Sequence, residues 1–129
     1  MSQPKSKLGF FVEKLTEFFK DLEYAFPEER DIKVALEYLD FAKKSNPRLI
    51  LDLFYDNVYR DAHEFIETED EEKVIAFARM KIQKQYTEIS SALSIFDKHW
   101  DSLDDQNRSA IWKYLKLLCL LCEKARATA

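Results

Sequence analysis

The chain has 129 residues, a net charge of −4 and a hydrophobic fraction of 47%, which fits one domain with a core of its own. One glycine and three prolines argue against a strand-rich fold, which needs many Gly and Pro turns, so the sequence predicts an all-α fold. Its two acidic blocks, residues 21–40 and 61–80, each carry seven acids and two bases, and without a basic stripe we expect no nucleic-acid partner.

Two amphipathic helices open the chain. Apolar residues at steps of three and four from Leu8 to Phe26 form one face of the first helix. Pro27 ends that helix, because the residue before a proline is pushed out of the α region. The second helix runs from about Asp31 to Lys44. Its core stripe is made of Ile32, Ala35, Leu36 and Leu39. A side stripe on another face is made of Val34, Tyr38 and Phe41.

The third predicted helix begins at "SNPR". Asn46 is the expected N-cap, and Pro47 suits the first helical position. The core face of this helix reaches Ile66. A side stripe again accompanies it, made of Tyr55, Val58 and Tyr59.

Two further helices complete the prediction. Thr68 and Glu71 have the spacing of a capping box. They open a near-heptad pattern that ends at Trp100, with Gln85 as its one polar interruption. Unbroken, that helix would approach about 30 residues and about 45 Å. The fifth helix is expected to start at Ser102 as cap, with Asp105 as its acid, and to run to about Ala125.

These elements predict one domain over residues 1–129. We expect a bundle of about five helices, because the connections between them are only a few residues long. Residues 1–7 and 126–129 are expected to be frayed ends.

The C-terminal stretch "AIWKYLKLLCLLCEKA" holds both cysteines, Cys119 and Cys122. Its six consecutive apolar residues are too few for a membrane span, which needs about 20. A redox pair is disfavoured, because the thiols sit near the helix C-terminus, where the dipole opposes a thiolate. Zinc would need His63 and His99 as further ligands, and these lie on separate helices. The pattern favours a central apolar core helix that buries the cysteines among leucines.

A catalytic constellation is not visible in the sequence. There is no Gly-rich phosphate loop, no G-x-S-x-G and no H-E-x-x-H. His63 and Glu67 share a helix face at i, i+4, and we interpret them as a surface pair. We therefore expect no enzyme activity, no cofactor and no metal.

Surplus aromatic residues are the only pointer to a binding site. The side stripes of the second and third helices lie off faces that already have a full set of core residues. One explanation is that these two helices are covered on two sides. The other is an exposed contact surface, because aromatic residues are enriched in interface cores. We predict such a surface, with Tyr38, Phe41, Tyr55 and Tyr59 as its partner-binding centre.

Two segments carry a resemblance to a known group of proteins. "FPEERDIKVALEYLDFAKKSNPRLI" (26–50) and "LSIFDKHWDSLDDQNRSAIWKYLKLLCLLCEKA" (93–125) resemble short helical proteins of large nucleocytoplasmic DNA viruses of algae and protists. The shared features are "FDKHW" and "IWKYLKLL". The resemblance implies a viral source and carries over no activity, cofactor or site residue.

The functional prediction is a non-enzymatic protein–protein interaction protein, in a viral setting an accessory or virion component. Its partner would be another protein or a second copy. One alternative is a helical regulator of the cell-death type, against which the absence of an "NWGR"-like motif counts. The other is a small enzyme or metal protein built on His63, His99, Cys119 and Cys122. Since Met1–Lys7 is polar and no signal peptide is visible, the expected location is the cytoplasm, of a host cell or as part of a virion.

Overall fold

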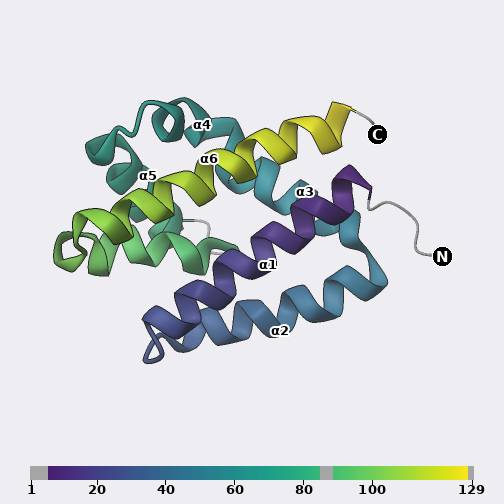
Figure 1. Ribbon diagram of the computed structural model, residues 1–129, viewed down its shortest axis with the longest axis horizontal. Helices are drawn as coiled ribbons and strands as arrows, with labels where there is room; N and C mark the ends of the chain where they lie inside the picture. The colour runs from purple at the N-terminus through teal and green to yellow at the C-terminus, as the bar shows by residue number, and fades with distance from the viewer. Residues whose placement is uncertain (1–5, 85–88, 128–129) are drawn as a thin grey trace.

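A computed structural model describes residues 6–84 and 89–127, and over these ranges the chain is helical without strands. The all-α fold is confirmed, with six α-helices rather than five (Figure 1). Their bounds are α1 Lys7–Ala25, α2 Arg30–Ser45, α3 Pro47–Phe54, α4 Arg60–Glu67, α5 Glu71–Lys84 and α6 Asp105–Ala127. Four short turns of other helix types join them: η1 (π, Tyr55–Tyr59), η2 (3₁₀, Ile89–Leu93), η3 (π, Ile95–His99) and η4 (3₁₀, Trp100–Ser102).

The predicted third helix contains a π turn. Pro47 begins α3 as expected, and the helix continues through η1 into α4. Asn57, which is buried, lies in that turn and donates its side-chain amide to the Leu53 carbonyl at 2.9 Å. In a regular α-helix that carbonyl would receive the backbone N–H of Asn57. The side chain thus occupies a place in the ladder, which is a known cause of local helix widening.

The predicted 30-residue fourth helix is wrong. α5 covers Glu71–Lys84, and residues 85–88, which include Gln85, lie outside the described residues. Beyond them the chain forms 3₁₀ and π turns at residues 89–93 and 95–102. Serines explain the irregular part, since their hydroxyls compete with helical hydrogen bonds. The Ser94 hydroxyl, for example, donates to the Ser91 carbonyl at 2.7 Å. Even so, Leu93, Phe96 and Trp100 are buried, as the near-heptad pattern required.

Aspartates cap the two helices for which other residues were predicted. The Lys73 amide donates to Asp70 Oδ1 at 3.2 Å, so Asp70 caps α5 in place of Thr68. The Asn107 amide donates to Asp104 Oδ1 at 2.8 Å, so Asp104 caps α6 in place of Ser102. Both aspartates accept from the amide three residues later, the usual N-cap arrangement.

The helical ends extend further than expected. Ser6 caps α1 by accepting from the Gly9 amide at 2.9 Å, so Lys7 is already helical. At the other end α6 includes Arg126 and Ala127. The predicted frayed residues 1–5 and 128–129 lie outside the described residues.

α1 lies between α2 and α6, and α6 runs antiparallel to it across the face seen in Figure 1. One hydrophobic cluster joins buried residues of all six helices. The Phe11 and Phe54 rings meet edge to face at 5.2 Å, which ties α1 to α3. Trp100 and Trp112 meet at 5.4 Å and tie η4 to α6. Aromatic pairs at such separations add about 0.5–1.5 kcal/mol each beyond the area they bury.

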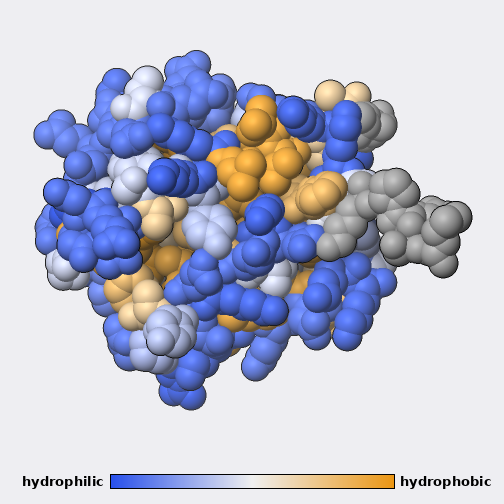
Figure 2. Space-filling view, viewed as in Figure 1, coloured by the Kyte–Doolittle hydropathy of each residue, from blue (hydrophilic) through white to orange (hydrophobic). Residues whose placement is uncertain are grey.

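The C-terminal helix is buried on one side only. Leu118 and Cys122 of α6 are fully buried, and Leu115 and Cys119 are nearly so, which confirms the predicted core face. Leu120, by contrast, is 45% exposed, and hydrophobic surface gathers over the C-terminal half of α6 (Figure 2). The prediction that other helices surround α6 is therefore wrong on its outer face. In the described part of the chain, no helix combines the length and apolar character needed to cross a membrane.

Candidate functional site

Two of the predicted partner-binding residues pack against α6. The Tyr59 phenol donates a hydrogen bond to the Glu123 carboxylate, which raises the pKa of Tyr59 well above its ordinary value. The Tyr55 and Tyr59 rings stack at 5.4 Å. The guanidinium carbon of Arg126 lies 3.5 Å above the centre of the Tyr55 ring. These two tyrosines hold the C-terminal end of α6 against η1.

The other two predicted residues belong to α2. Tyr38 is half-buried and packs against the core, whereas Phe41 is 70% exposed. Because α2 and α6 lie on opposite sides of α1 (Figure 1), the four aromatic residues do not form one continuous surface. Phe41 and Val34 are the two exposed members of the side stripes, whereas Tyr38, Tyr55 and Tyr59 are half-buried. The role of these residues in partner binding stays a prediction.

The structure does not bring together the histidines and cysteines of the alternative metal prediction. His63 stacks on Tyr59 at 4.4 Å, and its Nδ1 lies 2.8 Å from the Tyr59 carbonyl oxygen. His99 pairs instead with Glu29, at 2.7 Å. Cys119 and Cys122 are buried free thiols, and burial raises their pKa values to about 12 and about 11. Thiols with such pKa values are neutral near pH 7 and are poor nucleophiles and metal ligands.

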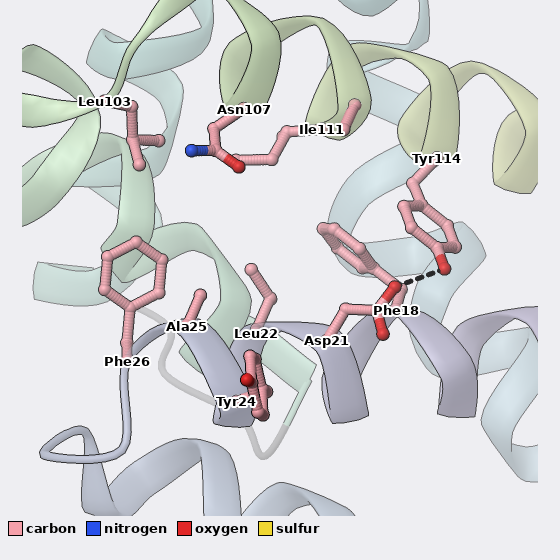
Figure 3. A pocket seen from close by; sticks show the side chains of 11 residues that line it. Phe18, Asp21, Leu22, Tyr24, Ala25, Phe26, Leu103, Asn107, Ile111 and Tyr114 are labelled. Carbon is pink, nitrogen blue, oxygen red and sulfur yellow. Dashed lines mark hydrogen bonds between the residues drawn. The ribbon is translucent and has the colours of Figure 1, made fainter.

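A hollow of about 390 Å³ lies between the C-terminal half of α1 and the N-terminal half of α6. Its walls come mainly from two antiparallel helices, whose side chains face one another across the opening (Figure 3). We call it the α1–α6 groove, and its lining residues are Phe18, Asp21, Leu22, Tyr24, Ala25, Phe26, Leu103, Asn107, Ala110, Ile111 and Tyr114. This volume lies within the range of ligand and side-chain binding sites in proteins.

The groove combines apolar walls with a few polar groups. Tyr114 of α6 donates to Asp21 Oδ2 of α1 at 2.5 Å (Figure 3). That hydrogen bond, together with partial burial, raises the pKa of Tyr114 to about 12. The Asn107 side chain adds an amide, and Tyr24, 91% exposed, stands beside the opening. Apolar pockets with a small number of placed polar groups are typical of binding sites.

Exposed apolar side chains continue from the groove along the same pair of helices. Leu117 and Leu120 follow Tyr114 on α6, and Phe10 of α1 is 48% exposed. The helices are antiparallel, and Phe18 contacts Tyr114 at 5.0 Å. Phe10, eight residues before Phe18, is therefore level with the last turns of α6, beyond Leu117. Exposed apolar side chains that lie together, rather than singly, are typical of interaction sites.

The groove was missed in the sequence because its walls read as ordinary core positions. Phe18, Leu22 and Ile111 fall on helix core faces and are buried. The opening arises where the small side chains of Ala25 and Ala110 line it. The sequence alone does not show that these two alanines lie in the same opening, because that depends on how α1 and α6 pack against each other. The exposed aromatic Tyr24, just before the end of α1, was the only available signal.

The lining residues offer binding groups rather than catalytic ones. Among the described residues that line the groove there is no histidine, cysteine, serine or lysine. Its one carboxylate, Asp21, accepts a hydrogen bond from Tyr114. Acid–base or nucleophilic catalysis needs several such groups that converge on one reacting atom. The arrangement can enclose an apolar group and accept hydrogen bonds at its rim.

Comparison of the chain with protein-family models, with curated proteins and with solved structures finds no match. The resemblance to proteins of large DNA viruses therefore stays a prediction.

Proposed function

We propose that the chain is a non-enzymatic protein–protein interaction protein, and that the α1–α6 groove takes a bulky apolar side chain from its partner. The observation that carries this proposal is the apolar hollow flanked by exposed Tyr24, Leu117 and Leu120. An anchor residue in a pocket, surrounded by further apolar contacts, is the usual energetic arrangement of a protein interface.

The negative charge of this chain indicates which partner residues would lie beside the apolar side chain that enters the groove. Asp21 lies at the groove, and the whole chain carries a net charge of −4. A partner segment with a lysine or arginine near its apolar anchor would complement this surface, because electrostatic complementarity favours the correct register and speeds association. We therefore propose a partner segment of mixed apolar and basic character.

The test uses a residue that lines the groove without belonging to the core. Ala110 of α6 is exposed and lines the groove, so Ala110→Arg fills the opening and leaves the core residues in place. Full burial of an apolar anchor contributes about 1.5–3 kcal/mol. Loss of that term should weaken partner binding by roughly 10- to 150-fold.

The matched control is Ala76→Arg. Ala76 is an exposed alanine within α5 and does not line the groove. Tagged wild type and both variants would be purified with their bound proteins from the native cell, and the bound proteins identified by mass spectrometry. We expect a partner that the wild type and Ala76→Arg recover and that Ala110→Arg loses, with unchanged melting of all three. A partner that binds Ala110→Arg as well as wild type would place the contact elsewhere.

The exposed face of α2 around Phe41 is the second candidate for the surface that contacts a partner. It is 70% exposed, and Val34 on the same side of α2 is 54% exposed. If Phe41→Ala, rather than Ala110→Arg, lost the partner, the predicted aromatic stripe of α2 would be the contact surface. The viral setting, as an accessory or virion component in the host cytoplasm, is a prediction from the sequence resemblance alone.

A further inference from the structure

We propose that Glu28, Glu29 and His99 form a binding site for a divalent transition metal, with Zn²⁺ as the first candidate. One ligand atom from each residue lies within 4.8 Å of the other two. His99 and the glutamates are about 70 positions apart in the chain, and folding brings His99 Nε2 to 2.7 Å from Glu29 Oε1. The carboxylates were not part of the predicted metal set, which joined His99 to His63 and the cysteines.

The surrounding structure holds the two inner ligands in place. The Phe26 ring stacks on the His99 imidazole at 4.5 Å and fixes the plane of the ring. Glu29 precedes the first turn of α2 but makes no side-chain capping hydrogen bond, so its carboxylate points to His99 instead. The His99 and Glu29 side chains are only 21% and 15% exposed. Ligands with restrained orientation lose less freedom when a metal binds.

The donor set suits zinc. One imidazole nitrogen and two carboxylate oxygens are ligands that Zn²⁺ accepts, at about 2.0–2.2 Å, with water in a fourth position. A tetrahedron with such bonds has ligand atoms about 3.4 Å apart. The distance between His99 Nε2 and Glu29 Oε1, now 2.7 Å, must therefore increase by less than about 1 Å. The Glu28 carboxylate must also move closer to both atoms. The Glu28 side chain is exposed, so rotation about its own bonds can bring its carboxylate toward the other two ligands.

Two competitors define the conditions for binding. The Lys98 ammonium lies 3.7 Å from Glu29 Oε2 and already offers that carboxylate one positive charge. A divalent ion carries two positive charges and can therefore neutralise the carboxylates of both Glu28 and Glu29. A proton on His99 is the second competitor, because imidazole binds metal only in its neutral form.

A bound metal would join two parts of the fold. Glu28 and Glu29 lie in the connection before α2, and His99 closes the π turn η3. The metal would link this connection directly to the irregular segment before α6. Any ligand that binds only the folded state stabilises it by mass action, so zinc should raise the melting temperature in a concentration-dependent way.

The test is a titration of ZnCl₂ into the full-length protein after removal of metal with a chelator, at a pH above 7. Isothermal titration calorimetry should show one zinc per chain, and thermal melting should rise with zinc. His99→Gln and Glu28→Gln should each lower the affinity by at least about tenfold. The matched control is His63→Gln, which removes the other histidine and should leave zinc binding unchanged. Co²⁺ in place of Zn²⁺ should give a spectrum without a thiolate charge-transfer band, because the ligands are nitrogen and oxygen.

Two outcomes would overturn the site. The first is the absence of saturable one-to-one zinc binding by the wild-type protein. The second is binding that survives both His99→Gln and Glu28→Gln, or that depends on His63 or on the thiols. Because Glu28 is exposed, Glu28→Gln keeps the test valid even if His99→Gln disturbs the fold.

Discussion

The phenol of Tyr114 in α6 donates a 2.5 Å hydrogen bond to the Asp21 carboxylate in α1, across 93 positions of the chain. A second phenol–carboxylate pair, Tyr59 with Glu123, holds α6 to η1 two to three turns later. These pairs fix α6 at two points along its length, and the α1–α6 groove lies beside the first of them.

The Tyr114–Asp21 pair predicts a pH dependence of stability at high pH. The pKa of Tyr114 is raised to about 12 in the folded state, whereas an unperturbed tyrosine has a pKa of about 10. The folded state therefore holds this proton more tightly, and the stability that the pair contributes below pH 10 is lost as the pH rises toward about 12.

Denaturant unfolding of wild type and Tyr114→Phe measures that contribution. Near pH 7 the variant should be less stable by about 1 kcal/mol, the size of one hydrogen bond. The difference should shrink as the pH rises above 10. A difference that stays constant over this range would contradict the raised pKa of Tyr114.

The two cysteines should be unreactive in the folded protein. Cys119 is 3% exposed and Cys122 is 0% exposed, and burial raises the pKa of both thiols. We expect labelling by a disulfide reagent near pH 7 to be slower than in the denatured chain by about two orders of magnitude or more, since it must wait for local opening. Rapid labelling of both thiols without denaturant would show that this part of α6 is not packed as described.

Leucines on opposite sides of α6 offer a matched test of its one-sided burial. Leu118 is fully buried and Leu120 is 45% exposed. Leu118→Ala should lower the free energy of unfolding by about 2–5 kcal/mol, because it leaves a cavity in the core. Leu120→Ala should change it by less than about 0.5 kcal/mol. Similar losses from both variants would indicate that the outer face of α6 is covered after all.

Substitution of Phe41 and of Tyr55 by alanine should distinguish a residue that contributes to partner binding from one that contributes to the stability of the fold. Tyr55 stacks on Tyr59 and also contacts the guanidinium of Arg126, so Tyr55→Ala should lower the free energy of unfolding by about 1–3 kcal/mol. Phe41 is mostly exposed, and Phe41→Ala should leave thermal melting nearly unchanged. Any loss of association in Phe41→Ala then reports a contact surface on α2, measured by analytical ultracentrifugation or by binding to an identified partner. A large drop in melting would instead show that Phe41 is packed.

Local patterns in the sequence determined the helices and most of the core. The spacing of apolar residues predicted the core face of α1, and Phe11, Leu15 and Phe19 are buried. Pro27 and Pro47 marked an end and a beginning that the structure retains. The burial of Cys119 and Cys122 followed from their leucine-rich setting. These features depend on neighbours within a few residues, so a sequence reveals them.

Only the tertiary structure decided which side chains meet and which face stays open. His99 meets Glu29, Tyr59 meets Glu123, and Ala25 and Ala110 leave a groove between two helices. Each of these relationships joins residues dozens of positions apart. Which partner a side chain finds depends on how the helices pack against one another, and the periodicity of a single helix says which side is apolar but not which neighbour covers it.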